Sequence, residues 1–308
     1  MISQRDSLFN TLFEETQKDK DIIILSADFG APALDRIQVE RKDQFYHLGI
    51  SEQNLIDVAI GLALRGKKVF TYAMAPFISL RCAEQHKLAA MMDLPIVNIV
   101  AGVGLSYANA GPTHYATEDY SLAANTINSR VYTFSDAAQT SSFVGHYLSR
   151  PHHCFVRLDR EPLPHIPVLS DFSAGYRVVN GKGSVGIISH GYCVAKLNHI
   201  IEKHELHDTA TLIDLFHSKP ISKEFMKKIQ KFDKLVVVDE QIETSSLGQF
   251  LALEVRRQRP EVSYDTISLK EEFMFENVGR SKLVEISGIS EESILEKILQ
   301  PNVKFIAS

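Results

Sequence analysis

Short runs of apolar and β-branched residues alternate with longer segments of helical periodicity along almost the whole chain. In the first half, residues 52–64 and 78–92 place apolar side chains at three- and four-residue spacing, which predicts packed helices. Around these segments, runs of strand-forming residues occur at 21–27, 68–73, 95–101, 130–134 and 153–158. This alternation predicts an α/β fold in which helices connect the strands of a parallel sheet.

The second half of the chain repeats the pattern. Strands are expected at 184–189, 210–215, 234–240 and 262–269, and helices near 192–204, 222–231, 246–257 and 280–300. Residues 161–183, between the halves, contain three prolines together with glycines and serines, a composition typical of a linker. Because 308 residues suffice for about two domains, we expect two three-layer α/β domains with parallel sheets, at 1–165 and 184–308, joined by a linker at 166–183.

Charge and cysteine usage exclude several classes of protein. The 33 Lys and Arg against 38 Asp and Glu leave a net charge of -5, without the basic excess that binding to nucleic acid uses. The longest weakly polar stretch, 94–105, is too short to span a bilayer, and the N-terminus lacks the apolar core of a secretory signal. Cys82, Cys154 and Cys193 form no CxxC pair. We therefore expect a cytoplasmic protein without a metal site of its own, and neither nucleic acid nor membrane as a partner.

One glycine motif fails on context. Gly181, Gly183 and Gly186 spell GxGxxG, but a dinucleotide site needs these glycines after a strand and at the start of a helix. Here they precede the expected strand at 184–189, so we interpret them as a flexible linker that runs into that strand. The patterns GxxxxGK[ST], HExxH and GxSxG are absent from the sequence.

Three polar segments stand where α/β proteins place ligands, after strands and at the starts of helices. They are SADFGAP (26–32), LGISEQN (48–54) and AGPTHYATED (110–119). Glu52 opens an apolar helix, where it could bind a ligand or only stabilise the helix dipole. His114 follows a Gly-Pro turn, which could present it to a substrate or belong only to a capped loop. The residues alone leave both alternatives open.

Taken together and in order, these segments resemble the pyrimidine-binding domain of the transketolase family, followed by the C-terminal domain of that family. LGISEQN resembles the G-I-x-E-Q block, FTYAMAPFISLRCAEQ (70–85) the aromatic block that continues into Arg-x-x-[DE]-Q, and AGPTH the G-P-T-H block. The resemblance covers essentially the whole chain. It implies a transferase that depends on thiamine pyrophosphate and moves a two-carbon ketol unit from a ketose to an aldose.

The resemblance also implies roles for cofactor-binding residues. Glu52 would contact N1′ of the aminopyrimidine ring so that the ring's amino group can act as an internal base, a task that suits a partly buried carboxylic acid. Phe77 would stack on the ring, with Tyr72 as the alternative because the local alignment slips easily. Asp28 falls where the family lines the thiamine pocket, and the helix behind it carries Arg81 and Gln85.

Further residues would meet the substrate. The resemblance makes His114 a catalytic and substrate-binding residue that polarises oxygen atoms or moves a proton. Arg5, Arg157 and Arg160 resemble positions that bind substrate phosphate in relatives. The alternative for the last two is a surface ion pair with Asp159 or Glu161.

The family holds the cofactor's diphosphate and its divalent metal with a Gly-Asp-Gly motif, and this motif is absent from the 308 residues. The chain starts with Met1 and proceeds directly into the pyrimidine-binding pattern. We therefore expect the small subunit of a split transketolase, whose large subunit supplies the Gly-Asp-Gly domain and Mg²⁺. Thiamine pyrophosphate would be shared between the subunits, in an assembly of two copies of each.

Two positions depart from the transketolases that act on common sugar phosphates. Ala110 replaces an acidic residue before G-P-T-H, and Gly102 stands where a histidine is frequent. We therefore expect a modified or specialised sugar, phosphorylated or not, as the substrate.

One alternative function is an enzyme with a pyruvate-type donor, similar to deoxyxylulose-phosphate synthase or to the beta chain of a 2-oxo-acid dehydrogenase, although G-P-T-H favours the transketolases. A second is a scaffold subunit without catalysis, against which the presence of both Glu52 and His114 argues.

Overall fold

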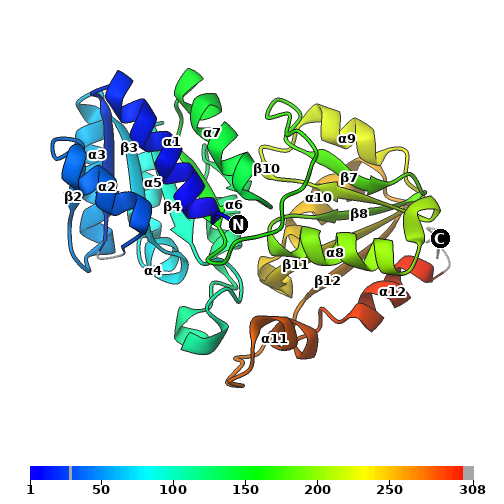
Figure 1. Ribbon diagram of the computed structural model, residues 1–308. Helices are drawn as coiled ribbons and strands as arrows, with labels where there is room; N and C mark the ends of the chain where they lie inside the picture. The colour runs from blue at the N-terminus through cyan, green and yellow to red at the C-terminus, as the bar shows by residue number, and fades with distance from the viewer. Residues whose placement is uncertain (28–29, 301–308) are drawn as a thin grey trace. The chain divides into compact units, whose positions relative to one another are not determined.

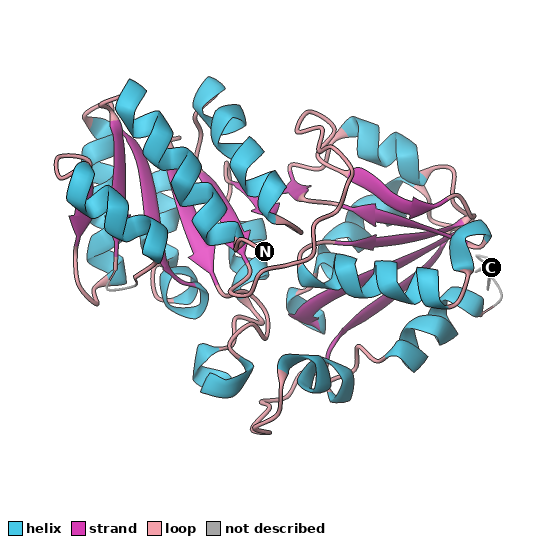
Figure 2. Ribbon diagram, viewed as in Figure 1, coloured by secondary structure: helices cyan, strands magenta, loops and turns pink. Residues whose placement is uncertain are grey.

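The computed structural model describes residues 1–27 and 30–300, and its chain divides into two compact units. Unit 1 comprises Met1–Val103 and Leu122–His165, and unit 2 comprises Gly104–Ser121 and Ile166–Ser308. Contacts thus group a segment from within the predicted first domain, 104–121, with the second half of the chain. Figures 1 and 2 show that each unit is a sheet with helices on both faces.

Unit 1 contains a parallel sheet with strand order β5-β6-β4-β3-β1-β2. The strands are β1 (Ile22–Ser26), β2 (Phe45–His47), β3 (Lys68–Met74), β4 (Ile96–Ala101), β5 (Arg130–Thr133) and β6 (Cys154–Leu158). Every residue of β1, β4 and β6 is buried, which explains their nearly continuous apolar runs. β2 was not predicted, because it is a three-residue edge strand in which only Phe45 is buried.

The helices of unit 1 form a layer on each face of its sheet (Figure 1). α1 contacts α2 and α7, and α3 contacts α4 and α5. The bounds are α1 (Gln4–Lys18), α2 (Pro32–Glu40), α3 (Glu52–Leu64), α4 (Ala75–Leu80), α5 (Ala83–Met91) and α7 (Ala137–Ser149), while α6 (Asp119–Asn125) begins in the segment 104–121. The helix expected at 78–92 is therefore two helices, separated at Arg81 and Cys82.

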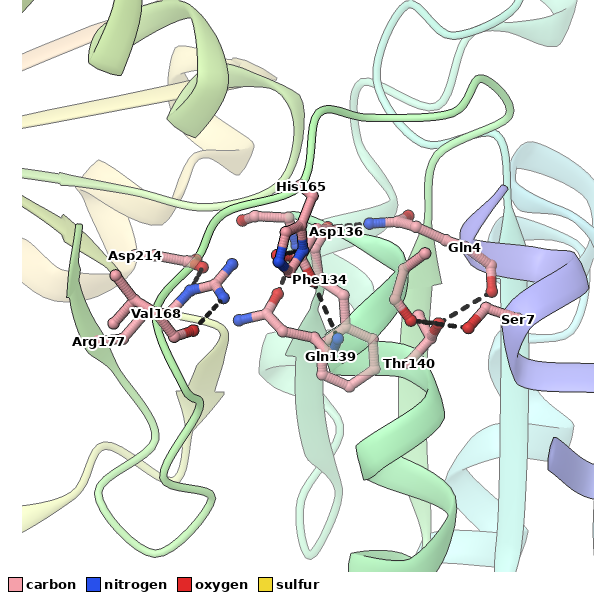
Figure 3. A network of polar contacts seen from close by, with 12 residues as sticks. Gln4, Ser7, Phe134, Asp136, Gln139, Thr140, His165, Val168, Arg177 and Asp214 are labelled. Atoms are coloured by element: carbon pink, nitrogen blue, oxygen red, sulfur yellow. Dashed lines mark hydrogen bonds and ion pairs between the residues drawn. The ribbon is translucent and has the colours of Figure 1, made fainter. Parts of the chain in front are cut away.

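Side-chain hydrogen bonds join α1 to α7, as Figure 3 shows. Thr140 Oγ1 donates to the Gln4 carbonyl over 3.0 Å, and Ser7 Oγ donates to the Ala137 carbonyl over 2.8 Å. Gln4 Nε2 also donates to the carbonyl of Phe134 over 2.6 Å. These bonds fix the N-terminal helix on unit 1.

Unit 2 contains a five-stranded sheet in the order β12-β11-β8-β9-β7, parallel except for β7, which runs antiparallel to β9. The strands are β7 (Arg177–Gly181), β8 (Val185–Ser189), β9 (Ala210–Asp214), β11 (Lys234–Ile242) and β12 (Ser263–Leu269), and β10 (His217–Lys219) is a short strand after β9. β7 lies inside the range expected to be a linker. Arg177 ties it to β9 through a buried ion pair, with Nε 2.9 Å from Asp214 Oδ2 (Figure 3).

The helices of unit 2 are α8 (Tyr192–Lys203), α9 (Lys223–Ile229), α10 (Leu247–Gln258), α11 (Arg280–Ile286) and α12 (Glu291–Leu299). Single helical turns occur at η1 (Ala108–Ala110), η2 (Pro112–His114), η3 (Leu206–Asp208) and η4 (Glu243–Ser245). The helix expected at 280–300 is wrong as one element. Gly288 adopts a φ of +118°, and Ser290 starts α12 by accepting the amide N–H of Ser293.

The GxGxxG glycines allow close backbone packing in unit 2. Gly181 has a φ of +78°, and a Cβ there would collide with the backbone of Ala210. A Cβ at Gly183 would collide with the backbone of Thr209 and Ala210. Gly186 lies inside β8, against the ring of Phe232. The strand context agrees with the exclusion of a dinucleotide site, but the expected flexible linker is wrong, because Gly181 ends β7 and the glycines are closely packed.

None of the helices in the described part of the chain has the length and hydrophobicity that a membrane crossing needs. Cys82, Cys154 and Cys193 are buried free thiols.

A glycine substitution tests the packing explanation. We expect Gly183→Ala to lower the free energy of unfolding by about 2 kcal/mol or more, because a methyl group would displace the Thr209 backbone. Gly145→Ala is the matched control, since Gly145 is an exposed residue inside α7 and a methyl group there would have no neighbouring atom within 4 Å; it should raise stability by about 0.5–1 kcal/mol. Denaturant unfolding of both variants measures the difference, and equal tolerance would contradict the packing role.

Candidate functional site

The chain changes direction within the sheet of unit 1 between β1 and β3. β1 is followed along the chain by its neighbour β2, and the next strand, β3, lies on the other side of β1. In open α/β sheets, ligands bind outside the carboxyl ends of the strands at such a point. Glu52 follows β2, and Phe77 and Arg81 follow β3, so the topology brings these three predicted residues to this edge.

Glu52 is the first residue of α3 and is 3% exposed. Its Oε2 accepts a hydrogen bond from Arg81 Nη1 at 2.5 Å, while the Arg81 side chain is 45% exposed. A residue that only stabilises the helix dipole does not need a partner 29 residues away in the sequence. Glu52 is thus a buried carboxylate whose charge is balanced by a cation that reaches into solvent.

The aromatic candidates lie in different surroundings. Phe77 is half-buried in α4, with the Arg81 guanidinium carbon 5.0 Å from its ring centroid. Tyr72 is fully buried inside β3, with its ring edge-to-face to Phe9 at 5.0 Å. Phe77 is therefore the aromatic residue that joins Glu52 and Arg81, and we call these three residues the Glu52 cluster. Tyr72 packs in the core beneath α1.

Contacts between α4 and α5 hold the segment that carries Phe77 and Arg81. The carbonyl of Ile78 is 2.8 Å from His86 Nε2, which must donate because a carbonyl can only accept. Burial lowers the pKa of His86 to about 4, so its ring is neutral at pH 7. Burial and the nearby Glu52 charge raise the pKa of the Cys82 thiol to about 12, which keeps Cys82 protonated.

Gln85, on α5, is partly buried, and its Oε1 accepts no hydrogen bond from the residues that the structure describes. Such an atom is a candidate acceptor for a polar ligand group. Asp28 lies outside the described residues.

His114 belongs to unit 2, in a different unit from Glu52. Gly111, at a φ of +84°, precedes the short turn η2, whose last residue is His114. The imidazole is half-buried, and its Nδ1 lies 3.0 Å from Thr113 Oγ1. The expected Gly-Pro turn is present, and His114 is partly accessible at its end.

The three predicted phosphate-binding arginines all belong to unit 1 but differ in exposure. Arg157, in β6, is 2% exposed and donates from Nη1 to Thr133 Oγ1 over 2.9 Å. Arg5 pairs with its neighbour Asp6 at 3.1 Å in α1, whereas Arg160 is exposed after β6. Arg157 is thus an interior side chain, not one of the surface arginines considered in the sequence alternative.

Within residues 1–27 and 30–300, no group of three or more His, Cys, Asp or Glu side chains is arranged to hold a metal ion. A cavity of about 870 Å³ in unit 2 lies between α8, α11 and α12, apart from every residue proposed for the site. Its lining contains four glutamates and one lysine, so its charge does not suit an anionic sugar phosphate. These charged residues are Lys196, Glu285, Glu291, Glu292 and Glu296.

The residues at the end of β11 were not predicted to be functional from the sequence. Glu240 and Gln241 are buried there and contact the segment that carries His114. The available signal was the polar triplet Asp-Glu-Gln at the carboxyl end of an apolar strand, where α/β proteins place functional side chains.

The low pKa of His86 predicts acid sensitivity of unit 1. The folded pKa lies below the ordinary value of 6.5, so the unfolded chain takes up a proton first and stability is lost as the pH falls from about 6.5 toward 4. Between pH 7 and pH 5 we expect His86 to account for a loss of about 2 kcal/mol. His86→Gln keeps a side-chain donor but cannot titrate, so it should lose less stability over this range. Equal losses in the variant and the unmodified chain, measured by denaturant unfolding, would contradict the assignment.

Residues 1–165 match the family described as "Transketolase, pyrimidine binding domain". The chain therefore belongs to the transketolase family, as the motifs predicted.

Two relatives carry the names of transketolase subunits. The chain is 29% identical over 260 residues to an apulose-4-phosphate transketolase subunit of Phocaeicola vulgatus, covering 80% of this chain and 82% of that protein. It is 31% identical over 196 residues to 6-deoxy-6-sulfo-D-fructose transketolase subunit SqwH of Clostridium sp. (strain MSTE9), covering 62% of this chain and 61% of that one. A 1-deoxy-D-xylulose-5-phosphate synthase of Clostridium tetani is 22% identical over 92% of this chain, which spans 46% of the synthase.

A solved structure shares the fold of the whole chain. The protein described as "Split gene transketolase, inactive beta4 tetramer" matches with a TM-score of 0.84 over 97% of both chains, at 23% identity. The predicted fold class, two α/β domains with mainly parallel sheets as in transketolases, is confirmed.

Proposed function

We propose that this chain is the small subunit of a split transketolase that depends on thiamine diphosphate and transfers a two-carbon ketol unit from a ketose to an aldose. The observation that carries the proposal is the Glu52 cluster, in which Arg81 joins a buried carboxylate to a half-buried aromatic ring at the edge of a parallel sheet where ligands usually bind. The subunit names of two relatives support the split organisation.

The residues present fit one end of the cofactor. Glu52 would exchange a hydrogen bond and a proton with a ring nitrogen, Phe77 would stack on the pyrimidine, and Gln85 Oε1, which no described residue bonds, offers an additional acceptor. When bound, thiamine diphosphate supplies the electron sink for breaking and forming carbon–carbon bonds. The residues present do not fit the other end of the cofactor. The sequence lacks the Gly-Asp-Gly motif that binds the diphosphate and Mg²⁺ in the family, and the described residues contain no cluster of metal ligands.

In this proposal a separate large subunit supplies the diphosphate and metal site, in an assembly of two copies of each subunit, and the subunit names of two relatives support this organisation. The pyrimidine-binding domain is assigned to 1–165 and the C-terminal domain to 184–308 together with β7, which lies in the expected linker 166–183 but pairs with β9.

Within this chain, Arg81 balances the charge of Glu52. A ring nitrogen that takes the place of Arg81 at Oε2 would exchange one hydrogen bond of Glu52 for another. The exposure of Arg81 makes such an exchange feasible, because its guanidinium can move into water without being desolvated. His114 would polarise substrate oxygen atoms or move a proton, and substrate phosphate would bind arginines of the group Arg5, Arg157 and Arg160.

The central assignment is tested by Glu52→Gln. The amide keeps the shape of the side chain but cannot exchange a proton, so we expect kcat for ketol transfer to fall by about 10²- to 10⁴-fold. The assay uses the chain purified together with a large subunit that contains Gly-Asp-Gly, with thiamine diphosphate and Mg²⁺ added. Glu14→Gln is the matched control, since Glu14 is an exposed residue of α1 outside the family motifs and its substitution should leave kcat unchanged. Unchanged activity in Glu52→Gln would refute the proposal.

The substrate is proposed to be a modified or specialised ketose rather than a common pentose phosphate. Ala110 and Gly102 depart from the usual pattern, and two relatives are named for apulose 4-phosphate and 6-deoxy-6-sulfo-D-fructose. In a kcat/KM screen of the reconstituted pair, branched or substituted ketoses should exceed xylulose 5-phosphate by at least about tenfold, or about 1.4 kcal/mol of transition-state binding. The outcome that sinks this prediction is xylulose 5-phosphate with ribose 5-phosphate as the best pair.

The same screen includes pyruvate as donor, because a deoxyxylulose-phosphate synthase is among the relatives. Pyruvate as the best donor would favour that second candidate function over ketol transfer.

A further inference from the structure

We infer that the end of β11 positions the loop that carries His114. Three residues form this β11 clamp: Glu240 and Gln241 at the end of the strand, and Arg280 at the start of α11. The inference rests on the proposed function in one respect, because the proposed function makes His114 a residue that acts on the substrate. All contacts involved lie within unit 2.

The rigid part of the clamp is a buried ion pair. Arg280 Nε donates to Glu240 Oε1 at 2.9 Å, and Arg280 Nη2 donates to Oε2 at 2.6 Å. The Arg280 guanidinium also lies 3.9 Å from the ring centroid of Tyr192. A two-point hydrogen-bonded pair that also stacks on a ring has little freedom to rotate, so the Glu240 carboxylate has a fixed position.

The loop begins directly against this carboxylate. Gly104 has a φ of +59°, and a Cβ added there would lie 2.8 Å from Glu240 Cδ and closer still to Oε2. A side chain at this position would therefore displace the loop or the ion pair. The backbone amide and carbonyl of Gly104 bond those of Ala116 at 2.9 Å, which closes the loop at its base.

Gln241 binds the backbone on the other side of the base of this loop. Its Nε2 donates to the Ala116 carbonyl at 2.9 Å, and its Oε1 accepts the amide N–H of Tyr120 at 3.4 Å. The amide of Ile242 donates to the Thr117 carbonyl at 3.1 Å. The end of β11 thus bonds the backbone immediately after His114 at three points.

Apolar contacts fix the interior of the loop. Leu105, Ala108 and Tyr115 belong to the hydrophobic core of unit 2, and the hydroxyl of Tyr115 donates to the Ala108 carbonyl at 3.0 Å. His114 precedes the buried Tyr115 and is itself half-buried. The imidazole therefore projects from a backbone whose neighbours are anchored.

The location within the sheet explains why these contacts converge. β8 leads through α8 to its neighbour β9, and β11 lies on the other side of β8, so the chain of unit 2 changes direction between β8 and β11. This is where an open α/β sheet usually binds a ligand. In unit 2 the residues at the end of β11 bind the protein's own loop, and we infer that this holds His114 for the substrate.

Amide hydrogen exchange of the full chain tests whether the β11 clamp holds the loop, and the measurement does not depend on catalytic activity. Gln241→Met keeps the volume but removes both side-chain hydrogen bonds to the loop, so amide exchange in residues 104–121 should become at least tenfold faster. Thr211→Val is the matched control, because it removes a buried bond from Thr211 to the Gly183 carbonyl at the opposite end of the sheet. It should leave exchange in 104–121 unchanged. Unchanged exchange in Gln241→Met would overturn the inference.

If Gln241→Met loosens the whole of unit 2, Gly104→Ala decides the question. Faster exchange confined to 104–121 in that variant supports the clamp, and an unchanged loop overturns it.

A double-mutant cycle in the reconstituted enzyme tests whether the clamp acts through His114. Gln241→Met should lower kcat/KM at least tenfold alone, but less than twofold when His114→Ala is already present. Additive losses would overturn a role through His114. If His114→Ala alone has no effect on ketol transfer while Gln241→Met still loosens the loop, the role proposed for His114 fails and the anchoring by β11 stands.

Discussion

The direction of the strands is the constraint on which both units depend. When neighbouring strands run parallel, each connection must return the chain to the starting edge, and all carboxyl ends meet at the other edge. Unit 1 thereby brings Arg81 to Glu52 across 29 residues of sequence. The helices that make these returns also bury both faces of the sheet, so strands such as β1 are almost entirely apolar, and Ser26, the one polar residue of β1, stands at its end.

The two units use the same edge for different purposes. In unit 1 the reversal between β1 and β3 presents a buried carboxylate and an aromatic ring. In unit 2 the residues at the corresponding point, between β8 and β11, contact the segment 104–121. They do so through hydrogen bonds to its backbone and through the buried Glu240–Arg280 pair. An ion pair of this kind gives little net stability against an apolar replacement, but it fixes geometry because neither partner can be left alone in the interior. Geometry is what a loop with a functional side chain requires.

Buried, regular elements could be predicted from the sequence, and elements fixed by tertiary contacts could not. The central strands and α3 were predicted because burial imposes a periodic apolar pattern on them. β2 and β7 escaped because three- and five-residue edge strands bury few side chains. The breaks at Arg81 and Gly288 interrupt segments whose apolar spacing continues across them. At the site, Glu52, Phe77 and Arg81 were found through motifs, while the interior position of Arg157 and the grouping of 104–121 with unit 2 depend on three-dimensional packing that no local pattern encodes.

The pairing of Glu52 with Arg81 shows why a buried acid of this kind needs a movable partner. A carboxylate in the interior without a cation is costly, whereas a carboxylate held between two buried cations would not release either of them. Arg81 avoids both problems, because its guanidinium reaches the buried Oε2 while nearly half of its side chain remains exposed. When the Arg81 guanidinium moves away from Glu52, it exchanges one hydrogen bond for solvation by water. A ligand that donates a hydrogen bond to Glu52 therefore has only a small free-energy cost to overcome. The residue that keeps Glu52 stable in the isolated chain is thus also one that can yield its position.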